Sequence, residues 1–388
     1  MYVKRMKIEA YRGLKSLDVS FDGPNEVGNV VNVLVGKNGS GKTTVLDLIS
    51  SWFTAHERSV EYGQMDVIDG PEISMFEDIS QGKKTRSFAS NLDNEVRTLT
   101  NGDIPPFKFP QFIYLPAMLQ FGEANSKKPL KLEYSLSATI RDNLLGRTAD
   151  YIKEFVIANE RLQNEADATI RAEKAVKAFN KPFASLNLST RLVGLDANNL
   201  NAPLFTNVDE ETFGIDGLSD GEKQIYGRLV GLMMLQPKNS VILIDEPEIA
   251  IHPAWQYRIL DIYKSIGSGN QLIVATHSAQ ILSSVPWQSI QVISREKEST
   301  RCDRLPGPPT GIDSASILSE VMGADFYHPE LHELKKQYRE LFDKKKESTP
   351  IGIELKEKLE NLESRDSEFF QELRMIEKIR ERKNEDNS

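Results

Sequence analysis

A glycine-rich segment near the start of the chain has the residue types and spacing that suit phosphate binding. Residues 36–43 read Gly-Lys-Asn-Gly-Ser-Gly-Lys-Thr, a match to the pattern Gly-x4-Gly-Lys-Ser/Thr. They follow the valine-rich run Val30–Val35 and precede helical apolar spacing over Lys42–Trp52. In such a strand–loop–helix unit, backbone N–H groups point inward at an anion and the helix start adds partial positive charge. The alternative, a glycine-rich turn that binds nothing, is disfavoured by the flanking strand and helix.

The polar residues of this loop have separate expected roles. Lys42 reaches the β- and γ-phosphates of a nucleotide, and the Thr43 hydroxyl binds Mg²⁺. The loop therefore predicts a nucleotide, bound through its phosphates, with Mg²⁺. The other candidate nucleotide-binding residues in it are Gly36, Asn38, Gly39, Ser40, Gly41 and Thr44.

Two acidic residues end a second apolar run, Val241–Ile244. Asp245 stands where a strand's carboxyl end presents a carboxylate to a Mg²⁺ shell, and Glu246 stands where it can polarise an attacking water. Taken alone, such a pair is usually only the entrance to a loop. Its occurrence in a chain with this glycine-rich loop favours the catalytic interpretation.

Two further segments are candidates for the site: one begins an expected helix and the other follows an expected strand. Leu218–Gln224 opens a helix with Ser219 as N-cap and Glu222 three residues later, a capping box that needs no function to explain it. A helix start with Ser219 and Gly221 is also an anion site. His277 follows the apolar run Gln271–Ala275. A lone histidine in that position is more often structural than catalytic.

These segments are positioned by alternating strands and helices. Because each expected strand is a continuous apolar run, the pattern predicts an α/β fold with a mostly parallel sheet covered on both faces. The expected strands are Val30–Val35, Gln111–Pro116, Leu186–Val193, Val241–Ile244 and Gln271–Ala275; the expected helices are Lys42–Trp52, one or two within Asp142–Phe179, Ser219–Leu235 and Pro253–Ser265. From Leu331 onward, apolar residues at three/four spacing among many charges predict a helical hairpin broken at Pro350–Gly352.

Composition narrows the class of protein. The single cysteine, Cys302, excludes an intrachain disulfide scaffold and a cysteine-based zinc site. No apolar run approaches the roughly 20 residues that cross a bilayer. A cytoplasmic protein without a membrane partner is therefore expected. The formal net charge of −9 neither requires nor excludes a nucleic acid partner.

Four segments, in this order, resemble the Walker A, signature, Walker B and switch-histidine motifs of ABC-type ATPases: Gly36–Thr44, Leu218–Gln224, Val241–Glu246 and Thr276–Ser278. The segment Asp245–Pro253, Asp-Glu-Pro-Glu-Ile-Ala-Ile-His-Pro, is similar to the soluble SMC-like branch and not to transporters. Tyr11-Arg12-Gly13 resembles that branch's Phe-Arg-Gly. The branch includes RecF, the DNA-repair exonuclease-associated ATPases and the overcoming-lysogenisation-defect family. The resemblance covers about residues 1–300.

The resemblance implies a P-loop head whose ATP sites form between two copies of the chain. It implies lobes at 1–135 and 183–300, a helical insertion at 136–182 and a C-terminal helical extension at 301–388. Ser219 and Gly221 of one copy would face the nucleotide of the other. The residues with an implied role at that nucleotide are Glu246, His277 and Lys42 in catalysis, Thr43 and Asp245 at the metal, and Arg12 near the phosphates.

The chain departs from the family pattern at two places. The signature has Asp220 and Glu222 where transporters usually have Gly and Gln, as SMC-like proteins tolerate. More seriously, Ala117 stands where the Q-loop glutamine is expected, and Gln120 is a candidate substitute. The Q-loop therefore stays unassigned.

The C-terminal stretch Gly311–Gly323 resembles the tail of PtuA-type ATPases of Septu and retron anti-phage systems, in which the ATPase acts with an HNH nuclease, PtuB. An ordinary capped helix with a solvated, charged hairpin explains the same residues about equally well. The resemblance implies an ATPase subunit of a bacterial antiviral defence complex that forms a dimer or higher oligomer with ATP and regulates a separate nuclease. A reverse transcriptase with its RNA or DNA is a further implied partner. A RecF-like genome-maintenance ATPase that binds DNA is the alternative, and a transporter subunit is disfavoured.

Overall fold

The computed structural model describes two compact units, Met1–Met322 and Gly323–Ser388, each considered by itself. The described residues are 1–24, 28–54, 62–68, 74–78, 110–117, 137–139, 147–296, 299–307, 322 and 329–385. Gln120 lies outside them, as does all of the 311–323 stretch except Met322.

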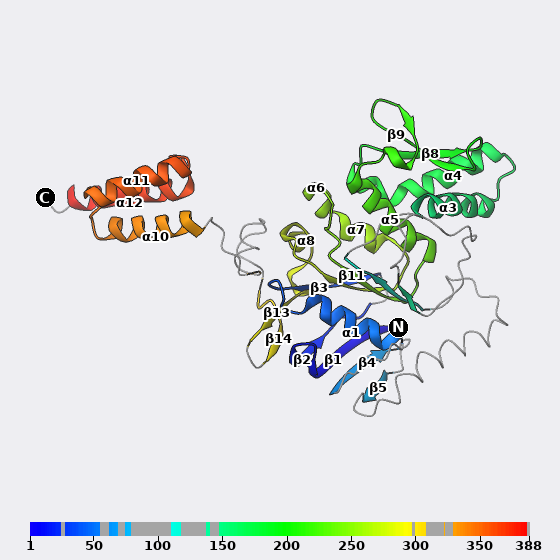
Figure 1. Cartoon of the computed structure of the whole chain (residues 1–388), viewed down its shortest axis with the longest axis horizontal. Coiled ribbons are helices and arrows are strands. Elements are labelled where there is room, and N and C mark those ends of the chain that lie inside the picture. Colours follow the sequence, from blue (N-terminus) through cyan, green and yellow to red (C-terminus); the bar gives the residue numbers. More distant parts are fainter. Residues whose placement is uncertain are drawn as a thin grey trace. The chain divides into compact units, whose positions relative to one another are not determined.

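A seven-stranded sheet organises the larger unit (Figure 1). Its strand order is β14-β13-β3-β12-β11-β6-β7, and every neighbouring pair is parallel except β13 and β14. The strands are β3 (Val30–Val35), β6 (Phe112–Leu115), β7 (Ser137–Thr139), β11 (Val241–Asp245), β12 (Gln271–Ala275), β13 (Ile290–Arg295) and β14 (Thr300–Arg304). The expected α/β fold with a mostly parallel sheet is confirmed. Residues 301–304, which the sequence analysis assigned to the C-terminal extension at 301–388, belong to strand β14 of this sheet.

Both faces of the sheet are buried because successive side chains alternate between two cores. On β3, Val33 and Val35 join the core under α5, α7 and α8, whereas Leu34 joins the core under α1 (Figure 1). The antiparallel sheet β2-β1-β4-β5 completes the second core. These elements are α1 (Lys42–Thr54), α5 (Asp220–Leu235), α7 (Ile259–Ser265), α8 (Ala279–Ser283), β1 (Tyr2–Tyr11), β2 (Leu14–Ser20), β4 (Tyr62–Ile68) and β5 (Ser74–Asp78).

Two elements begin or end differently from the sequence expectation. The helix expected over Pro253–Ser265 is divided into α6 (Pro253–Gln256) and α7. The strand expected over Leu186–Val193 is shifted, because Lys181–Leu186 forms a short 3-10 helix and β8 runs from Arg191 to Asp196. β8 pairs with β9 (Ala202–Thr206), which pairs with β10 (Thr212–Phe213).

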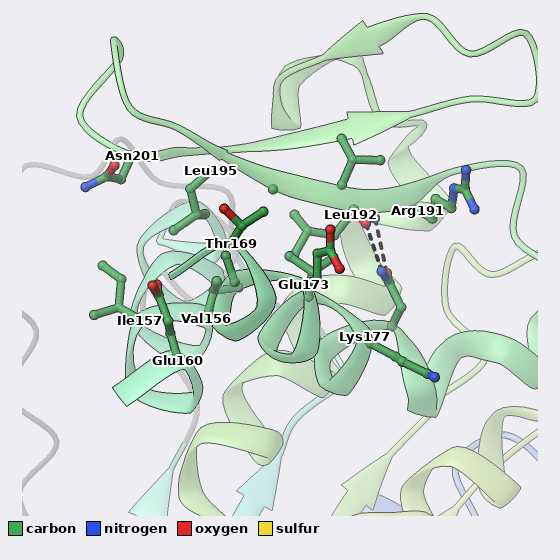
Figure 2. Close-up of a pocket in the computed structure, with 15 residues that line it drawn as sticks. Val156, Ile157, Glu160, Thr169, Glu173, Lys177, Arg191, Leu192, Leu195 and Asn201 are labelled. Carbon is green, nitrogen blue, oxygen red and sulfur yellow. Dashed lines mark hydrogen bonds between the residues drawn. The ribbon is translucent and has the colours of Figure 1, made fainter. Parts of the chain in front are cut away.

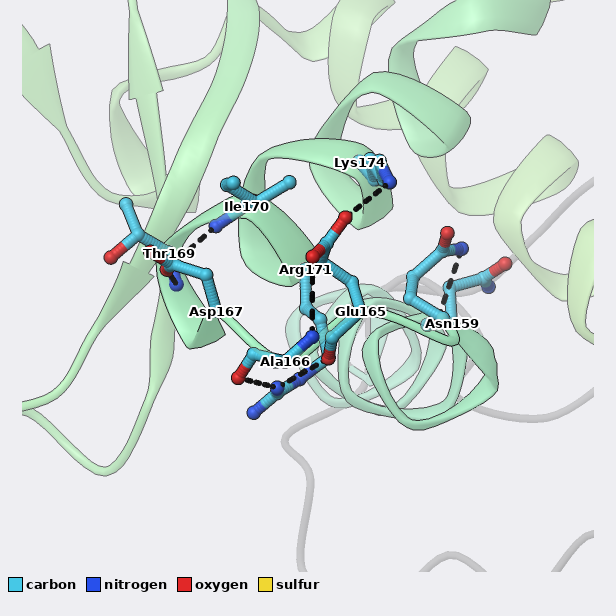
Figure 3. Close-up of polar contacts among 9 residues, drawn as sticks. Asn159, Glu165, Ala166, Asp167, Thr169, Ile170, Arg171 and Lys174 are labelled. Atoms are coloured by element: carbon cyan, nitrogen blue, oxygen red, sulfur yellow. Dashed lines mark hydrogen bonds and ion pairs between the residues drawn. The ribbon is translucent and has the colours of Figure 1, made fainter.

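The helical segment expected within Asp142–Phe179 is two helices, α3 (Thr148–Leu162) and α4 (Ala168–Asn180). Polar contacts fix the turn between them (Figure 3). Asp167 caps α4 by accepting hydrogen bonds from the N–H groups of Thr169 and Ile170, and Arg171 donates to the carbonyls of Glu165 and Ala166. Such capping satisfies donors that a helix start leaves open. The conformation of this turn is therefore determined by hydrogen bonds among its own residues.

The expected helical hairpin is wrong, because the described residues 329–385 form three helices: α10 (Pro329–Asp343), α11 (Pro350–Leu362) and α12 (Glu368–Glu385). Pro350 begins α11 behind the Thr349 N-cap, a position that needs no N–H from proline. A second break follows Leu362, where Glu363 is extended. Leu362 and Phe369 are seven residues apart, a spacing that continuous helix also fits, so periodicity concealed this break.

A buried ion pair holds this unit together. The Lys335 Nζ lies 2.8 and 2.7 Å from the two carboxylate oxygens of Glu363, and the lysine side chain is only 8% exposed. We expect Glu363→Gln to lower the free energy of unfolding of the unit by about 3 kcal/mol, because it removes the carboxylate of a buried ion pair. The exposed pair Glu354 and Lys358 is the matched control, and Glu354→Gln should have a much smaller effect because solvent screens that pair. Chemical denaturation of the full chain, followed through the C-terminal transition, measures both; equal effects would contradict the expectation.

Among the residues that the structure describes, no helix is both long and apolar enough to span a membrane.

Candidate active site

Three predicted motif segments leave the carboxyl ends of adjacent parallel strands. β12 lies between β3 and β11, and the register places Ala275 beside both Leu34 and Asp245. The glycine-rich loop follows β3, Glu246 follows β11, and His277 follows β12. The carboxyl edge of a parallel sheet is where such folds place ligand-binding residues. The fold therefore brings the glycine-rich loop, the acidic pair and the histidine to one edge.

The loop needs glycine at two positions for steric reasons. A Cβ on Gly36 would lie 2.2 Å from the Ile293 carbonyl oxygen. Gly41 has a φ of +107°, and a Cβ there would lie 2.4 Å from a methyl carbon of Leu14. Any larger residue would push the loop away from β13 or β2. The tight loop places the start of α1 directly against the sheet edge.

Lys42 is almost fully buried, with 4% of its surface exposed. Its Nζ donates hydrogen bonds to the carbonyl oxygens of Gly36 (2.9 Å) and Lys37 (3.3 Å), so the side chain folds back over the loop. Burial lowers the pKa of Lys42, and the charges of Glu246, Asp245 and Glu248 oppose that shift. The Ser40 hydroxyl is also buried and has no hydrogen-bond partner in the described structure. The loop thus holds a buried cation and an unsatisfied hydroxyl.

Thr43 and Asp245 join the glycine-rich loop to β11. The Thr43 Oγ1 donates to the Asp245 Oδ1 at 3.1 Å, although the two residues are 202 positions apart. Burial raises the pKa of Asp245 to about 6, opposed by the Thr43 hydrogen bond and reinforced by the charges of Glu246, Asp47 and Glu248. Crowded carboxylates beside a hydroxyl are hard oxygen donors, and a divalent cation would relieve their repulsion. The residues present therefore fit Mg²⁺.

Glu246 and His277 face each other across the ends of β11 and β12. The His277 Nε2 lies 3.6 Å from a carboxylate oxygen of Glu246, and both side chains are about 30% exposed. Burial lowers the pKa of His277, the charge of Lys42 lowers it further, and Glu246 opposes both. A partly exposed carboxylate next to a neutral imidazole is an arrangement that can hold a water and receive its proton.

Glu248 and Thr276 also belong to this edge, and the sequence analysis gave them no role. The Glu248 Oε1 accepts hydrogen bonds from the Thr276 Oγ1 at 2.7 Å and from the His277 N–H at 2.6 Å. Burial raises the pKa of Glu248, while these two hydrogen bonds lower it. The signal in the sequence was a third acidic residue, after Asp245 and Glu246, within the segment Asp245–Pro253 that resembles the SMC-like branch.

The predicted capping box at Ser219 is present. The Ser219 Oγ and the Glu222 carboxylate exchange hydrogen bonds with the first-turn N–H groups of α5. Ser219 is exposed, and its described hydrogen bonds stay within this turn. A Cβ on Gly221 would lie 3.0 Å from the Ala250 carbonyl oxygen, so this helix start packs on the turn after β11. No described contact joins Ser219 or Gly221 to the glycine-rich loop of the same chain.

Arg12 lies beside α1. It occupies the bend between β1 and β2 with a φ of +47°, and its guanidinium pairs with Asp47 at 3.1 Å. Asp47 also accepts a hydrogen bond from the Tyr114 hydroxyl at 3.3 Å. Because Asp47 is one turn after Thr43 on α1, Arg12 is near the start of that helix. Its role toward the phosphates stays a prediction.

At the expected Q-loop position, the Ala117 carbonyl accepts a short hydrogen bond from Arg228 of α5, whose side chain is fully buried. At this position the backbone carbonyl of Ala117 contacts α5, whereas the family pattern has a glutamine side chain. Gln120 is outside the described residues.

A pocket of about 770 Å³ lies elsewhere in the larger unit, between α3, α4 and β8 (Figure 2). Leu192 and Leu195 of β8 and Val156 of α3 give it an apolar lining. Asn180 fixes one side of it by exchanging two hydrogen bonds with the Leu192 backbone. None of the predicted site residues lines this pocket.

A family model described as "AAA ATPase domain" matches residues 1–202, more than half of the chain. The chain belongs to this AAA ATPase domain family. A second AAA domain model, whose description names the AbiEii toxin, matches residues 123–283. The family assignment agrees with the ATPase fold expected from the sequence motifs.

This AAA ATPase is similar to several curated proteins. It is 24% identical to the Septu protein PtuA of Bacillus thuringiensis over 84% of this chain and 85% of that protein. It is 21% identical to the Septu protein PtuA of Bacillus mycoides over 95% of this chain, but it spans only 51% of that protein. The "Retron Ec83 probable ATPase" of Escherichia coli is 25% identical over 52% of this chain and 38% of its own length.

Among solved structures, an SMC head bound to the C-terminal winged-helix domain of ScpA aligns with a TM-score of 0.45 and 15% identity, covering 79% of this chain and 98% of that one. The α/β fold of the AAA ATPase is established by its own strand order and strand pairing.

Proposed function

We propose that this AAA ATPase binds ATP with Mg²⁺ and hydrolyses the nucleotide at the edge formed by β3, β12 and β11. The observation that carries the proposal is the convergence of a buried lysine, a hydroxyl–carboxylate pair and a carboxylate–imidazole pair at that edge. Phosphoryl transfer needs positioning and charge stabilisation more than covalent chemistry. These three features supply both.

Each residue has one task in this proposal. Lys42 and the loop N–H groups bind the phosphates, and Thr43 and Asp245 would hold Mg²⁺, which neutralises phosphate charge when bound. Glu246 orients the attacking water and accepts its proton. His277, neutral at pH 7 because burial and Lys42 lower its pKa, holds the water or the terminal phosphate from the other side.

ATP-dependent association of two copies is part of the proposal. Ser219 is exposed at a helix N-terminus, where partial positive charge favours a phosphate, yet no described contact brings it to the loop of its own chain. A second copy could present this helix start to the nucleotide. Each site would then contain residues of both copies, so that hydrolysis would require the dimer.

The biological role that we propose is regulation of a separate effector nuclease in an anti-phage complex. The support is the similarity to proteins named Septu protein PtuA and to retron ATPases. An HNH nuclease is the expected effector, with a reverse transcriptase and its RNA or DNA as a further partner. A RecF-like role on DNA is the second candidate; its support is 34% identity to RecF of Francisella tularensis over only 18% of this chain.

Purification of the Glu246→Gln protein from its native host, with ATP and Mg²⁺, tests this role. Mass spectrometry identifies bound proteins, and sequencing identifies bound nucleic acid. We expect a nuclease to co-purify, and we expect a matched protein lacking residues 323–388 to lose it while retaining ATP binding. Recovery of DNA with repair proteins alone would support the RecF-like alternative. Retention of the nuclease by the shortened protein would place the docking surface in the larger unit.

A further inference from the structure

The turn that follows β11 has a strained but closely fixed backbone. Glu246 and Ala250 have φ values of +44° and +59°, a left-handed conformation that is strained for residues with a side chain. Three backbone hydrogen bonds hold it: Glu246 N–H to Ala275 O, Ile249 N–H to Glu246 O, and Ile251 N–H to Glu248 O. Strain of this kind persists only where the surroundings determine the conformation. The turn is therefore a fixed structure against which neighbouring segments can be held in place.

Glu248 connects this turn to the segment that carries His277. Its Oε1 receives the Thr276 hydroxyl and the His277 N–H, at 2.7 and 2.6 Å, just where the chain leaves β12. Its Oε2 is buried without a hydrogen-bond partner in the described structure. Burying a carboxylate is costly, and two hydrogen bonds compensate only partly. The energetic cost of burying this carboxylate is consistent with a role in fixing the backbone of residues 276 and 277.

The same turn reaches two other parts of the site. The Ala250 carbonyl lies against Gly221 at the start of α5. At the end of the turn, the Gln256 amide donates to the Ile251 carbonyl at 2.9 Å and accepts from the Ser278 hydroxyl at 2.7 Å. Glu248 thus lies in the middle of a turn that contacts three parts of the same chain: the acidic pair Asp245 and Glu246, residues 276–278, and the start of α5.

We propose that Glu248 is a positioning residue that fixes the backbone of residues 276–277, so that the His277 side chain stays opposite Glu246 during hydrolysis. This inference rests on the proposed ATPase activity. Glu248 acts through His277: it makes no described hydrogen bond or ion pair with the glycine-rich loop, although its charge opposes the lowering of the Lys42 pKa. Loss of its carboxylate would free the histidine segment and leave the phosphate-binding loop intact. The expected defect is therefore in turnover and not in nucleotide affinity.

Kinetics of Glu248→Ala and Glu248→Gln test the proposal. Glu248→Ala should lower kcat about 30-fold with less than a threefold change in KM for ATP. Glu248→Gln, whose amide oxygen still accepts both hydrogen bonds, should recover most of the rate. Thr276→Val should behave as a weaker version of Glu248→Ala, and Thr276→Ser should remain close to the unsubstituted protein. Glu211→Ala, at an exposed site, is the control.

A double-mutant cycle separates positioning from a general structural effect. In a His277→Ala background, Glu248→Ala should change kcat less than twofold, because its effect passes through the histidine. An unchanged kcat in Glu248→Ala would overturn the proposal. A full 30-fold further loss in the His277→Ala background would also overturn it.

Hydrogen–deuterium exchange supplies a readout that does not depend on turnover. The His277 amide hydrogen is donated to Glu248, so its exchange should accelerate at least about tenfold in Glu248→Ala while residues 241–245 stay protected. Unchanged exchange at residues 276–278 would overturn the inference whether or not the protein hydrolyses ATP. Absence of turnover in the unsubstituted protein, together with accelerated exchange in the variant, would instead reject the proposed ATPase activity and keep Glu248 as the support of this segment.

Discussion

Glu246→Gln should bind ATP with nearly unchanged affinity and hydrolyse it about 10³-fold more slowly, since loss of a general base costs about 10² to 10⁴ in rate. The amide keeps the size of the side chain but cannot accept a proton from water. His277, 3.6 Å away, has a lowered pKa and does not replace it as a strong base. Single-turnover hydrolysis and equilibrium binding of ATP measure the two quantities separately.

Accumulation of a dimer is part of the same expected result. If hydrolysis normally separates two ATP-bound copies, Glu246→Gln should elute as a dimer with ATP and as a monomer with ADP. Glu211→Gln, an exposed substitution of the same type, is the control and should resemble the unsubstituted protein. Turnover in Glu246→Gln within threefold of the unsubstituted rate would remove Glu246 from its role as base.

Lys42→Ala should weaken ATP binding about 100-fold, equivalent to about 3 kcal/mol, the value of a hydrogen bond between charged groups. Lys42 is the buried cation of the glycine-rich loop, and its ammonium already lies within hydrogen-bond distance of two loop carbonyls. The charges of Asp245 and Glu246 act on Lys42 in the described structure, so its removal takes away a positive charge beside these two carboxylates. The phosphates of the nucleotide would then be repelled more strongly by the carboxylates.

Lys37→Ala is the matched control for this second prediction. Lys37 is in the same loop and carries the same charge, but its side chain is exposed. It should change the affinity for ATP less than threefold. Fluorescent-nucleotide titration measures both variants, and thermal unfolding verifies that each is folded. Equal losses in the two variants would mean that the loop acts only through its net charge.

Contiguous motifs made the central part of this protein predictable from sequence. The residues from Gly36 to Thr43 specify strand, loop and helix together, because the glycine positions, the helix start and the lysine are adjacent in the chain. The same holds for the apolar run that ends at Asp245. Continuous apolar strands also indicated a parallel sheet, since only strands buried on both faces lack polar alternation.

The C-terminal helices show where periodicity alone gives the wrong answer. Apolar spacing predicted two helices and placed the break at Pro350, whereas proline begins a helix there and a second break follows Leu362. The spacing of apolar residues indicates which side chains share one face of a helix. It does not reveal an extended residue between two helices when the apolar residues on either side of it are still at helical spacing.

The fold class and the candidate site residues could be predicted from the sequence because each motif is formed by neighbours along the chain. The contacts between those motifs are visible only in the folded structure. The hydrogen bonds that Glu248 accepts from Thr276 and His277 join positions 28 and 29 residues apart. The contact between Gly221 and Ala250 joins two separate motifs. Such contacts depend on β11 and β12 being adjacent in the sheet, and strand order is set by packing of the whole core.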